Sequence, residues 1–238
     1  MKKIGLIGGM SWESSQVYYE IINQRVRELL GGFHSARCVM DSVNFAEIEA
    51  LQHANDWSAL NALMVESAVN LEKAKADIIV LCTNTMHLCS SAISKNINIP
   101  LLHIAEATGE KIKKKKLTKV LLLGTKFTME KDFYKTILTQ DFGIEVSIPN
   151  EADRNSVHEI IYRELVHGNI TTNSRNVYQR IIQEAAANGA EGVILGCTEI
   201  PLLISADDVS IPVFDTTRIH AESAVDFALQ DELSTKDA

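Results

Sequence analysis

The chain of 238 residues reads as one half-unit written twice. In the first half, one apolar run ends at Gly8 and another ends at Cys82, which a threonine follows at once. The second half repeats this order with Gly124 and Cys197. The glycine and the cysteine lie 74 positions apart in the first half and 73 in the second, and an Ile-Pro pair then opens a third apolar run in each. Three matching points in the same order predict two folding units of the same design.

Short apolar runs alternate with longer segments of helical periodicity along the whole chain. This alternation predicts parallel β-sheets that are covered by helices on both faces. The apolar runs expected to form strands lie at 4–7, 36–42, 78–81, 99–103, 120–123, 145–148, 193–195 and 211–215. The segments of helical period lie at 12–30, 57–74, 85–94, 129–140, 153–167, 174–188 and about 218–230.

From this order we expect an α/β fold of two pseudosymmetric, doubly wound lobes, with a ligand site in the cleft between them. The last helix is expected to pack back on the first lobe. The first lobe is therefore predicted to comprise residues 1–102 plus 213–238, and the second lobe residues 103–212.

The composition excludes several classes of protein. With 46% apolar and 23% charged residues the chain is ordinary globular material, and its apolar runs are far shorter than the roughly 20 residues that a membrane helix needs. A net charge of −8 argues against a nucleic-acid-binding face, and the basic run at 111–119 is expected to be a solvated helix end. The first apolar stretch breaks at Ser11, before it reaches the length of a signal peptide. We expect a cytoplasmic protein without nucleic-acid or membrane partners.

The four cysteines form no Cys-x-x-Cys pair and are expected to be reduced thiols. His87 with Cys82 and Cys89 has a spacing that matches no common zinc site, so no metal is expected. The Gly8 to Ser11 turn lacks the Gly-x-Gly-x-x-Gly pattern, and no phosphate loop occurs. We therefore expect no nucleotide cofactor either.

Both Cys-Thr pairs fall at the carboxyl edge of a predicted parallel sheet, where such folds bind their ligands. If the half-units face each other across a cleft, Cys82 and Cys197 approach one ligand from opposite sides. Racemisation needs this arrangement, because one group removes the α-proton from one face of a carbon while the other delivers a proton to the opposite face. Both cysteines are expected at helix N-termini, which would lower their thiol pKa.

A carbanion intermediate also needs hydrogen-bond donors for its carboxylate, where negative charge develops. Polar side chains of the required kind follow both cysteines, and the alternative interpretation is that they cap helices. They are Thr83, Asn84, Thr85 and Thr198. Cys38 and Cys89 lie away from the repeated positions and are expected to be core residues.

Eight segments, spread over nearly the whole chain, together form a specific pattern. They read IGLIGGMSWES, SVNFAEIEALQ, IVLCTNTMH, IPLLHIAEAT, LLLGTKFTM, ADRNSVHEIIYRELVHG, EGVILGCTEI and IPVFDTTRIHAESAVDFAL. Across these segments the chain resembles the aspartate/glutamate racemase family of amino-acid racemases. The resemblance implies two pseudosymmetric α/β lobes with the site between them, no pyridoxal phosphate or metal, and commonly a homodimer.

Carried over by position, the resemblance makes Cys82 and Cys197 the catalytic acid and base. It implies substrate contacts for Met10, Gln52, Thr83, Asn84, Thr85 and Thr198. Glu199 would either orient the substrate ammonium or cap a helix.

The chain departs from strict aspartate racemases in its side-chain clamp. His167 stands where such enzymes carry a lysine, and residues 43–47 lack their arginine. With His167 at the substrate side chain, a broad-specificity racemase that accepts polar or uncharged side chains fits at least as well as one dedicated to aspartate.

Two alternatives remain open from the sequence. One is a related enzyme that reuses the lobes, such as a maleate cis-trans isomerase, an arylmalonate decarboxylase or a hydantoin racemase. A decarboxylase needs only one proton donor, whereas both Cys-Thr steps are intact in this chain. The other is a two-lobed protein that only binds a small molecule.

Overall fold

The structure, a computed structural model, describes residues 1–233. The chain forms two compact units. The first unit comprises Met1–Ile104 and the C-terminal segment from His220 onward, and the second comprises Ala105–Ile219. Each unit has its own parallel four-stranded sheet.

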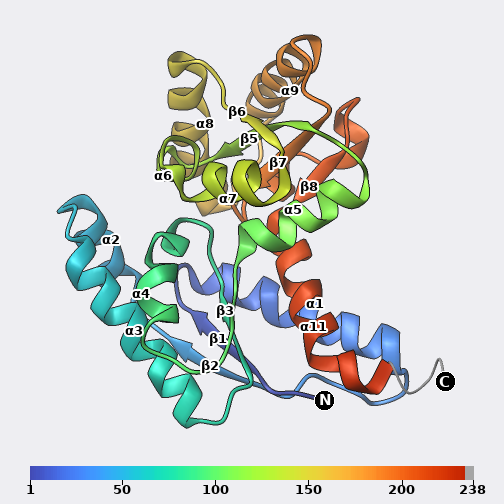
Figure 1. Ribbon diagram of the computed structural model, residues 1–238. Helices are drawn as coiled ribbons and strands as arrows, with labels where there is room; N and C mark the ends of the chain where they lie inside the picture. Colours follow the sequence, from blue (N-terminus) through green and yellow to red (C-terminus); the bar gives the residue numbers. More distant parts are fainter. Residues whose placement is uncertain (234–238) are drawn as a thin grey trace. The chain divides into compact units, whose positions relative to one another are not determined.

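The sheet of the first unit has the strand order β2-β1-β3-β4, of which β2, β1 and β3 are labelled in Figure 1. Its strands are β1 Ile4–Gly8, β2 Cys38–Ser42, β3 Ile78–Leu81 and β4 Leu101–Leu102. The central strands β1 and β3 are fully buried and read as continuous aliphatic runs, because helices cover both faces of the sheet.

Alternate residues of these strands point to two different cores. Ile4 and Val80 pack with α1, Trp12–Leu30, and with α11, Thr216–Leu233. Ile7 and Leu81 pack on the opposite face. That face is covered by α2 Phe45–His53, α3 Trp57–Lys73, the 3-10 helix η1 Thr85–Cys89 and α4 Ser90–Ser94 (Figure 1).

The sheet of the second unit has the order β6-β5-β7-β8. Its strands are β5 Lys119–Gly124, β6 Glu145–Ser147, β7 Gly192–Gly196 and β8 Val213–Asp215. Around them lie α5 Ile104–Lys114, α6 Lys126–Glu130, α7 Asp132–Phe142, α8 Glu151–Arg163, η2 Leu165–His167, α9 Thr172–Ala187, α10 Ile200–Leu203 and η3 Ala206–Asp208. Leu121 and Val193 pack with Ile161 of α8 and Ile182 of α9 in one core.

The two sheets therefore repeat one strand order, since β5 to β8 take the places of β1 to β4. The prediction of two doubly wound α/β lobes is confirmed. The expected single helix at 85–94 is divided into η1 and α4, and that expected at 129–140 is replaced by α6 and α7.

Two short segments belong to a different unit than predicted. Residues 103–104 are part of the first unit, and residues 213–219 are part of the second. The prediction assigned the last strand to the first lobe, but β8 pairs with β7, with Val213 opposite Val193. The chain returns to the first unit only inside α11, whose residues from Ala221 onward join the core of β1 and β3.

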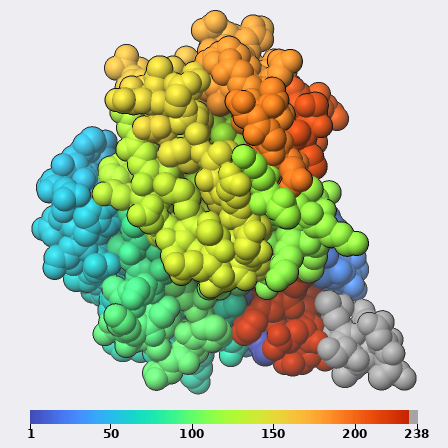
Figure 2. Space-filling model, turned by 45° about the horizontal axis from the view of Figure 1, so that its top comes forward, coloured from blue at the N-terminus to red at the C-terminus, as the bar shows by residue number. Residues whose placement is uncertain are grey.

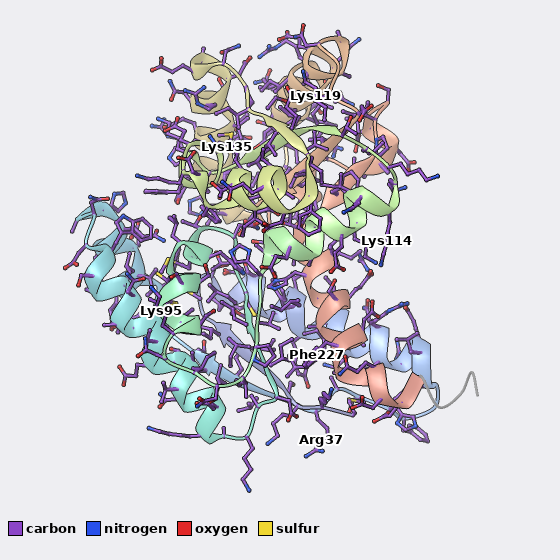
Figure 3. The ribbon with its side chains drawn as sticks, viewed as in Figure 1. Arg37, Lys95, Lys114, Lys119, Lys135 and Phe227 are labelled. Atoms are coloured by element: carbon purple, nitrogen blue, oxygen red, sulfur yellow. The ribbon has the colours of Figure 1, made fainter. Side chains whose placement is uncertain are left out.

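The basic run begins in the last turn of α5 and ends at the first residue of β5. Residues 113–116 are exposed, as expected of a solvated helix end, and Lys114 points away from the ribbon (Figure 3), whereas Lys111 and Lys119 are half-buried. None of the helices in the described part of the chain is long and apolar enough to cross a membrane.

Candidate active site

Cys82 directly follows β3, at the edge of the first sheet where the order of strand addition reverses. The chain runs from β1 to β2 on one side and returns to β3 on the other, so the ends of β1 and β3 form the topological switch point at which such sheets bind ligands. The Cys82 N–H donates to Ile7 O at 2.9 Å, which ties the residue to β1. Its side chain is fully buried.

The turn after β1 packs tightly against the loop that follows β2. Gly9 has a φ of +88°, and a Cβ at this position would lie 2.1 Å from the Val43 carbonyl oxygen. Only glycine fits this position. The Gly9 N–H donates to Ser15 Oγ at 2.8 Å, and Ser11 caps α1 by accepting from the Ser14 N–H.

The predicted substrate residues of the first unit gather around η1. Met10 is buried in the same apolar cluster as Leu81 and Met86. Gln52 comes from α2, a largely exposed helix that is light blue in Figure 2, and its Nε2 lies 3.1 Å from Met86 Sδ. Asn84 is buried and N-terminal to η1, whereas the neighbouring Thr83 and Thr85 are half-buried.

Three buried histidines, His87, His103 and His220, form a cluster next to η1. The sequence predicts no role for His103 and His220. His87 hydrogen-bonds to Thr83 O at 2.8 Å, and its ring lies 4.6 Å from that of His103 and 5.4 Å from that of His220, centroid to centroid. Burial lowers the pKa of His103 to about 4 and that of His220 to about 3. The signal for burial in the sequence is that His103 is the last residue of the apolar run at 99–103.

In the second unit the turn after β7 carries a carboxylate beside the thiol. Cys197 Sγ donates to Glu199 Oε2 at 2.9 Å, and Thr198 Oγ1 donates to the same oxygen at 2.9 Å. Cys197, Thr198 and Glu199 are all partly buried. The structure thus brings these three predicted site residues together in one hydrogen-bonded group.

The expectation of a lowered thiol pKa is wrong for both cysteines. Burial raises the pKa of Cys82, and burial together with the charge of Glu199 raises that of Cys197. The helices that follow are η1 with five residues and α10 with four, and both begin three residues after the cysteine. Desolvation of the charged form therefore outweighs any effect of these short helix ends.

The remaining predicted residues are placed as follows. His167 is exposed in η2, which packs beside α10 through Leu165 and Leu203. Cys89 is buried in the core, as expected, and burial raises its pKa to about 12. Cys38 is half-buried in β2.

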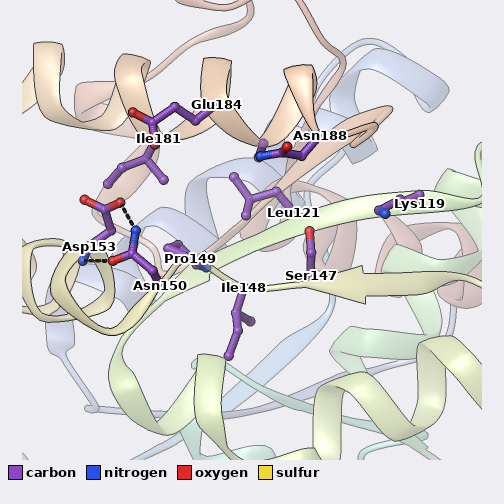
Figure 4. A pocket seen from close by; sticks show the side chains of 11 residues that line it. Lys119, Leu121, Ser147, Ile148, Pro149, Asn150, Asp153, Ile181, Glu184 and Asn188 are labelled. Carbon is purple, nitrogen blue, oxygen red and sulfur yellow. Dashed lines mark hydrogen bonds between the residues drawn. The ribbon is translucent and has the colours of Figure 1, made fainter.

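A cavity of about 310 Å³ in the second unit lies apart from the Cys-Thr turn (Figure 4). It lies between α9 and the strands β5 and β6, and neither Cys197 nor its neighbours line it. Its polar rim includes Lys119, Asp153 and Glu184, and Asn150 there caps α8 by accepting from the Asp153 N–H. The cavity therefore contains none of the predicted site residues, and each Cys-Thr turn is a candidate for catalytic chemistry within its own unit.

Comparisons with known proteins show what the chain as a whole is similar to. The family model described as Asp/Glu/hydantoin racemase matches residues 7–224. A candidate Asp/Glu racemase from Yersinia pestis has a similar crystal structure, with a TM-score of 0.93 and 51% identity, covering 97% of this chain and 100% of that one. An aspartate racemase homologue from Pyrococcus horikoshii has a TM-score of 0.85 and 38% identity, covering 96% and 99%. A broad-specificity amino-acid racemase from Bacillus subtilis is 27% identical over 170 residues, which is 71% of this chain and 73% of the relative.

Proposed function

This chain belongs to the Asp/Glu/hydantoin racemase family and is an amino-acid racemase, and we propose that Cys82 and Cys197 perform its chemistry without pyridoxal phosphate. The observation that carries the proposal is the repeated position of the two thiols. Each directly follows the third strand of a sheet, and both sheets have the same strand order. A core cysteine has no reason to recur at equivalent strand ends.

The proposed reaction moves one proton on each face of Cα. In one direction the Cys197 thiol first gives its proton to Glu199, whose carboxylate it already contacts at 2.9 Å. The resulting thiolate takes the α-proton, and the C–H electron pair moves into the substrate carboxylate. Cys82 then donates its thiol proton to the opposite face of Cα and becomes a thiolate. At this point Cys197 is again a thiol, Glu199 holds one extra proton and Cys82 lacks one. Glu199 then releases its proton to solvent and the Cys82 thiolate takes one from solvent, which restores the starting state. The opposite enantiomer uses the same steps in reverse order.

The proposal requires both turns to reach one substrate from opposite sides. Thr83, Asn84, Thr85 and Thr198 would donate hydrogen bonds to the substrate carboxylate, where charge develops in the transition state. A substrate ammonium near Glu199 would offset the carboxylate charge that raises the Cys197 pKa. Substrate binding would thus supply the thiolate that the substrate-free site disfavours.

We further propose a broad amino-acid specificity with no dedicated carboxylate clamp. His167 is exposed in η2 and would contact the substrate side chain from the second unit. Met10 and Gln52, which lie near Met86, would contact the substrate from the first unit. The similarity to a broad-specificity racemase supports this proposal.

The assembly and location of the enzyme are also proposals. A homodimer is implied by the family resemblance, and the first unit exposes the large apolar side chains Trp12, Tyr19 and Phe33, which are typical of protein contact surfaces. All four cysteines are free thiols, and free thiols persist in the cytoplasm. Analytical ultracentrifugation would distinguish the dimer from a monomer.

The decisive experiment follows Cα deuterium incorporation by NMR in heavy water. EDTA-treated enzyme without added pyridoxal phosphate is incubated with a panel of L- and D-amino acids. We expect exchange and racemisation of at least one amino acid. Activity that disappears on chelation, or that requires pyridoxal phosphate, would refute the proposal. Tight binding in isothermal titration without any exchange would instead favour the binding protein.

A further inference from the structure

Three histidines are buried together in the first unit, and two of them hydrogen-bond to the backbone. His87, His103 and His220 are each at most 6% exposed, and they come from η1, the end of β4 and α11. None of them takes part in the proton transfers proposed above. One of them, His87, nevertheless hydrogen-bonds to the turn that carries Cys82.

The tautomer of His87 follows from its two backbone partners. Its Nδ1 lies 2.8 Å from Thr83 O, and a carbonyl oxygen can only accept, so Nδ1 carries a proton. Its Nε2 accepts the Ile104 N–H at 3.2 Å and therefore carries none. Both bonds exist together only in the neutral Nδ1–H ring. Burial, and then the neighbouring histidines, lower the His87 pKa well below its ordinary value and keep the ring neutral.

His220 takes the opposite tautomer and holds the same stretch of chain. Its Nε2–H donates to Leu102 O at 2.9 Å, and its Nδ1 accepts from the Tyr18 hydroxyl at 2.9 Å. Residues 102–104 are thus fixed on both sides of His103. The chain leaves the first unit directly after Ile104 and re-enters it at His220.

We propose that His87 is a positioning residue for the Cys82 turn, and that it acts by holding the Thr83 carbonyl through Nδ1 and the Ile104 amide through Nε2. Thr83 directly follows Cys82, and its carbonyl belongs to the peptide that joins Thr83 to Asn84. Holding this carbonyl therefore fixes the backbone of the turn that carries the thiol and the first polar side chains. This inference rests on the proposed catalytic role of Cys82. His220 supports it by holding Leu102, two residues before Ile104, and the His103 ring packs against the His87 ring.

Two substitutions separate the two hydrogen bonds. In His87→Asn the side-chain amide nitrogen replaces Nδ1 and keeps the donor to Thr83 O, but the acceptor for the Ile104 N–H is lost. In His87→Gln the longer side chain places its oxygen near the position of Nε2 and keeps that acceptor, but the donor to Thr83 O is lost. His87→Leu removes both bonds. His53→Asn, on the exposed end of α2, is the matched control.

We expect kcat to fall about 100-fold in His87→Leu and in His87→Gln, since displacing a reacting group by about 1 Å costs this much. The kcat of His87→Asn should stay within about tenfold of the wild-type value, and the kcat of the control His53→Asn should equal the wild-type value. If the leucine variant does not fold, the order of asparagine above glutamine still decides the matter. The proposal is overturned if glutamine equals or exceeds asparagine, or if folded His87→Leu keeps wild-type kcat.

A second readout does not depend on catalysis. Nitrogen-15 NMR of the wild-type histidine rings should show His87 protonated at Nδ1 and His220 at Nε2, assigned by substitution of each. A protonated Nε2 on His87 would overturn the proposal even if the enzyme is active. Wild-type protein that racemises no amino acid but shows these tautomers would instead refute the proposed function and leave the hydrogen-bond assignment standing.

Discussion

The two Cys-Thr turns occupy the same place in two sheets of identical order, but their chemical surroundings differ. In the first unit the Cys82 thiol is buried beside apolar side chains, and the backbone after it is held by a neutral histidine. In the second unit the Cys197 thiol donates directly to a carboxylate. The two units therefore place a cysteine at the same strand end, but only the second unit places a carboxylate next to the thiol. The two thiols are expected to be unequal partners in a reaction that needs both.

The largest effect should come from removing either sulfur. We expect Cys82→Ser and Cys197→Ser each to lower racemisation by roughly 10³-fold or more, because a base and an opposed acid are both required. Each variant keeps one thiol and should still exchange the α-proton of one enantiomer, with opposite preference in the two variants. NMR in heavy water with separate L and D substrates measures this.

Cys38→Ser, in β2, serves as the control and should retain activity. Racemisation at the wild-type rate in either active-site variant would remove the two-thiol mechanism. Loss in only one variant would favour a one-donor enzyme such as a decarboxylase.

Glu199→Gln tests the difference between the two turns directly. We expect kcat to fall about 100-fold, because the amide cannot take the Cys197 proton. The same change removes a charge that raises the Cys197 pKa, so alkylation of Cys197 by iodoacetamide at pH 8 should become faster. Peptide mass spectrometry measures the alkylation rates of Cys197 and Cys82 separately, and the rate at Cys82 should be that of the wild type. Glu184→Gln, on the surface of α9, is the control. A parallel loss of both activity and alkylation would contradict this role of Glu199.

The histidine cluster predicts how the stability of the first unit depends on pH. The folded-state pKa of His103 is about 4, below the value near 6.5 expected on unfolding, so the unfolded chain binds more protons between these values. The free energy of unfolding should therefore fall as the pH drops from about 6.5 to 4. For His103 alone the loss is about 3 kcal/mol, and above pH 7 its contribution is constant.

Urea unfolding at pH 7.5 and pH 4.5 checks this prediction in wild type, His103→Phe and His34→Gln. His103→Phe should lose less stability on acidification than wild type. His34→Gln changes an exposed residue and should follow the wild type. An equal pH dependence in all three proteins would exclude His103 as a source of the acid sensitivity.

The smallest expected effect concerns the substrate side chain. Without a clamping lysine, aspartate should be preferred over homoserine or asparagine by less than about 100-fold in kcat/KM. His167→Lys should raise the aspartate preference about tenfold, through one added charge in the second unit. Arg163→Lys, which changes an exposed residue at the end of α8, is the control. A wild-type preference above about 100-fold would show that the clamp lies elsewhere.

The sequence by itself determined the repeated half-unit, the strands, and the placement of Cys82 and Cys197 at strand ends. These features follow from local patterns: aliphatic runs of strand length, the glycine turn before Ser11, and a side-chain period that changes between strand and helix. Local pattern therefore sufficed for the fold class and for the two thiols.

Tertiary structure alone decided what surrounds each sulfur. The pairing of β8 with β7 moved the unit boundary, and the contact between His87 and His220 joins residues from opposite ends of the first unit's sequence. Thiol pKa values were predicted in the wrong direction because desolvation depends on burial by distant segments, which no local spacing records. Hydrogen-bond partners such as Thr83 for His87 are likewise fixed only when packing brings the backbone within reach.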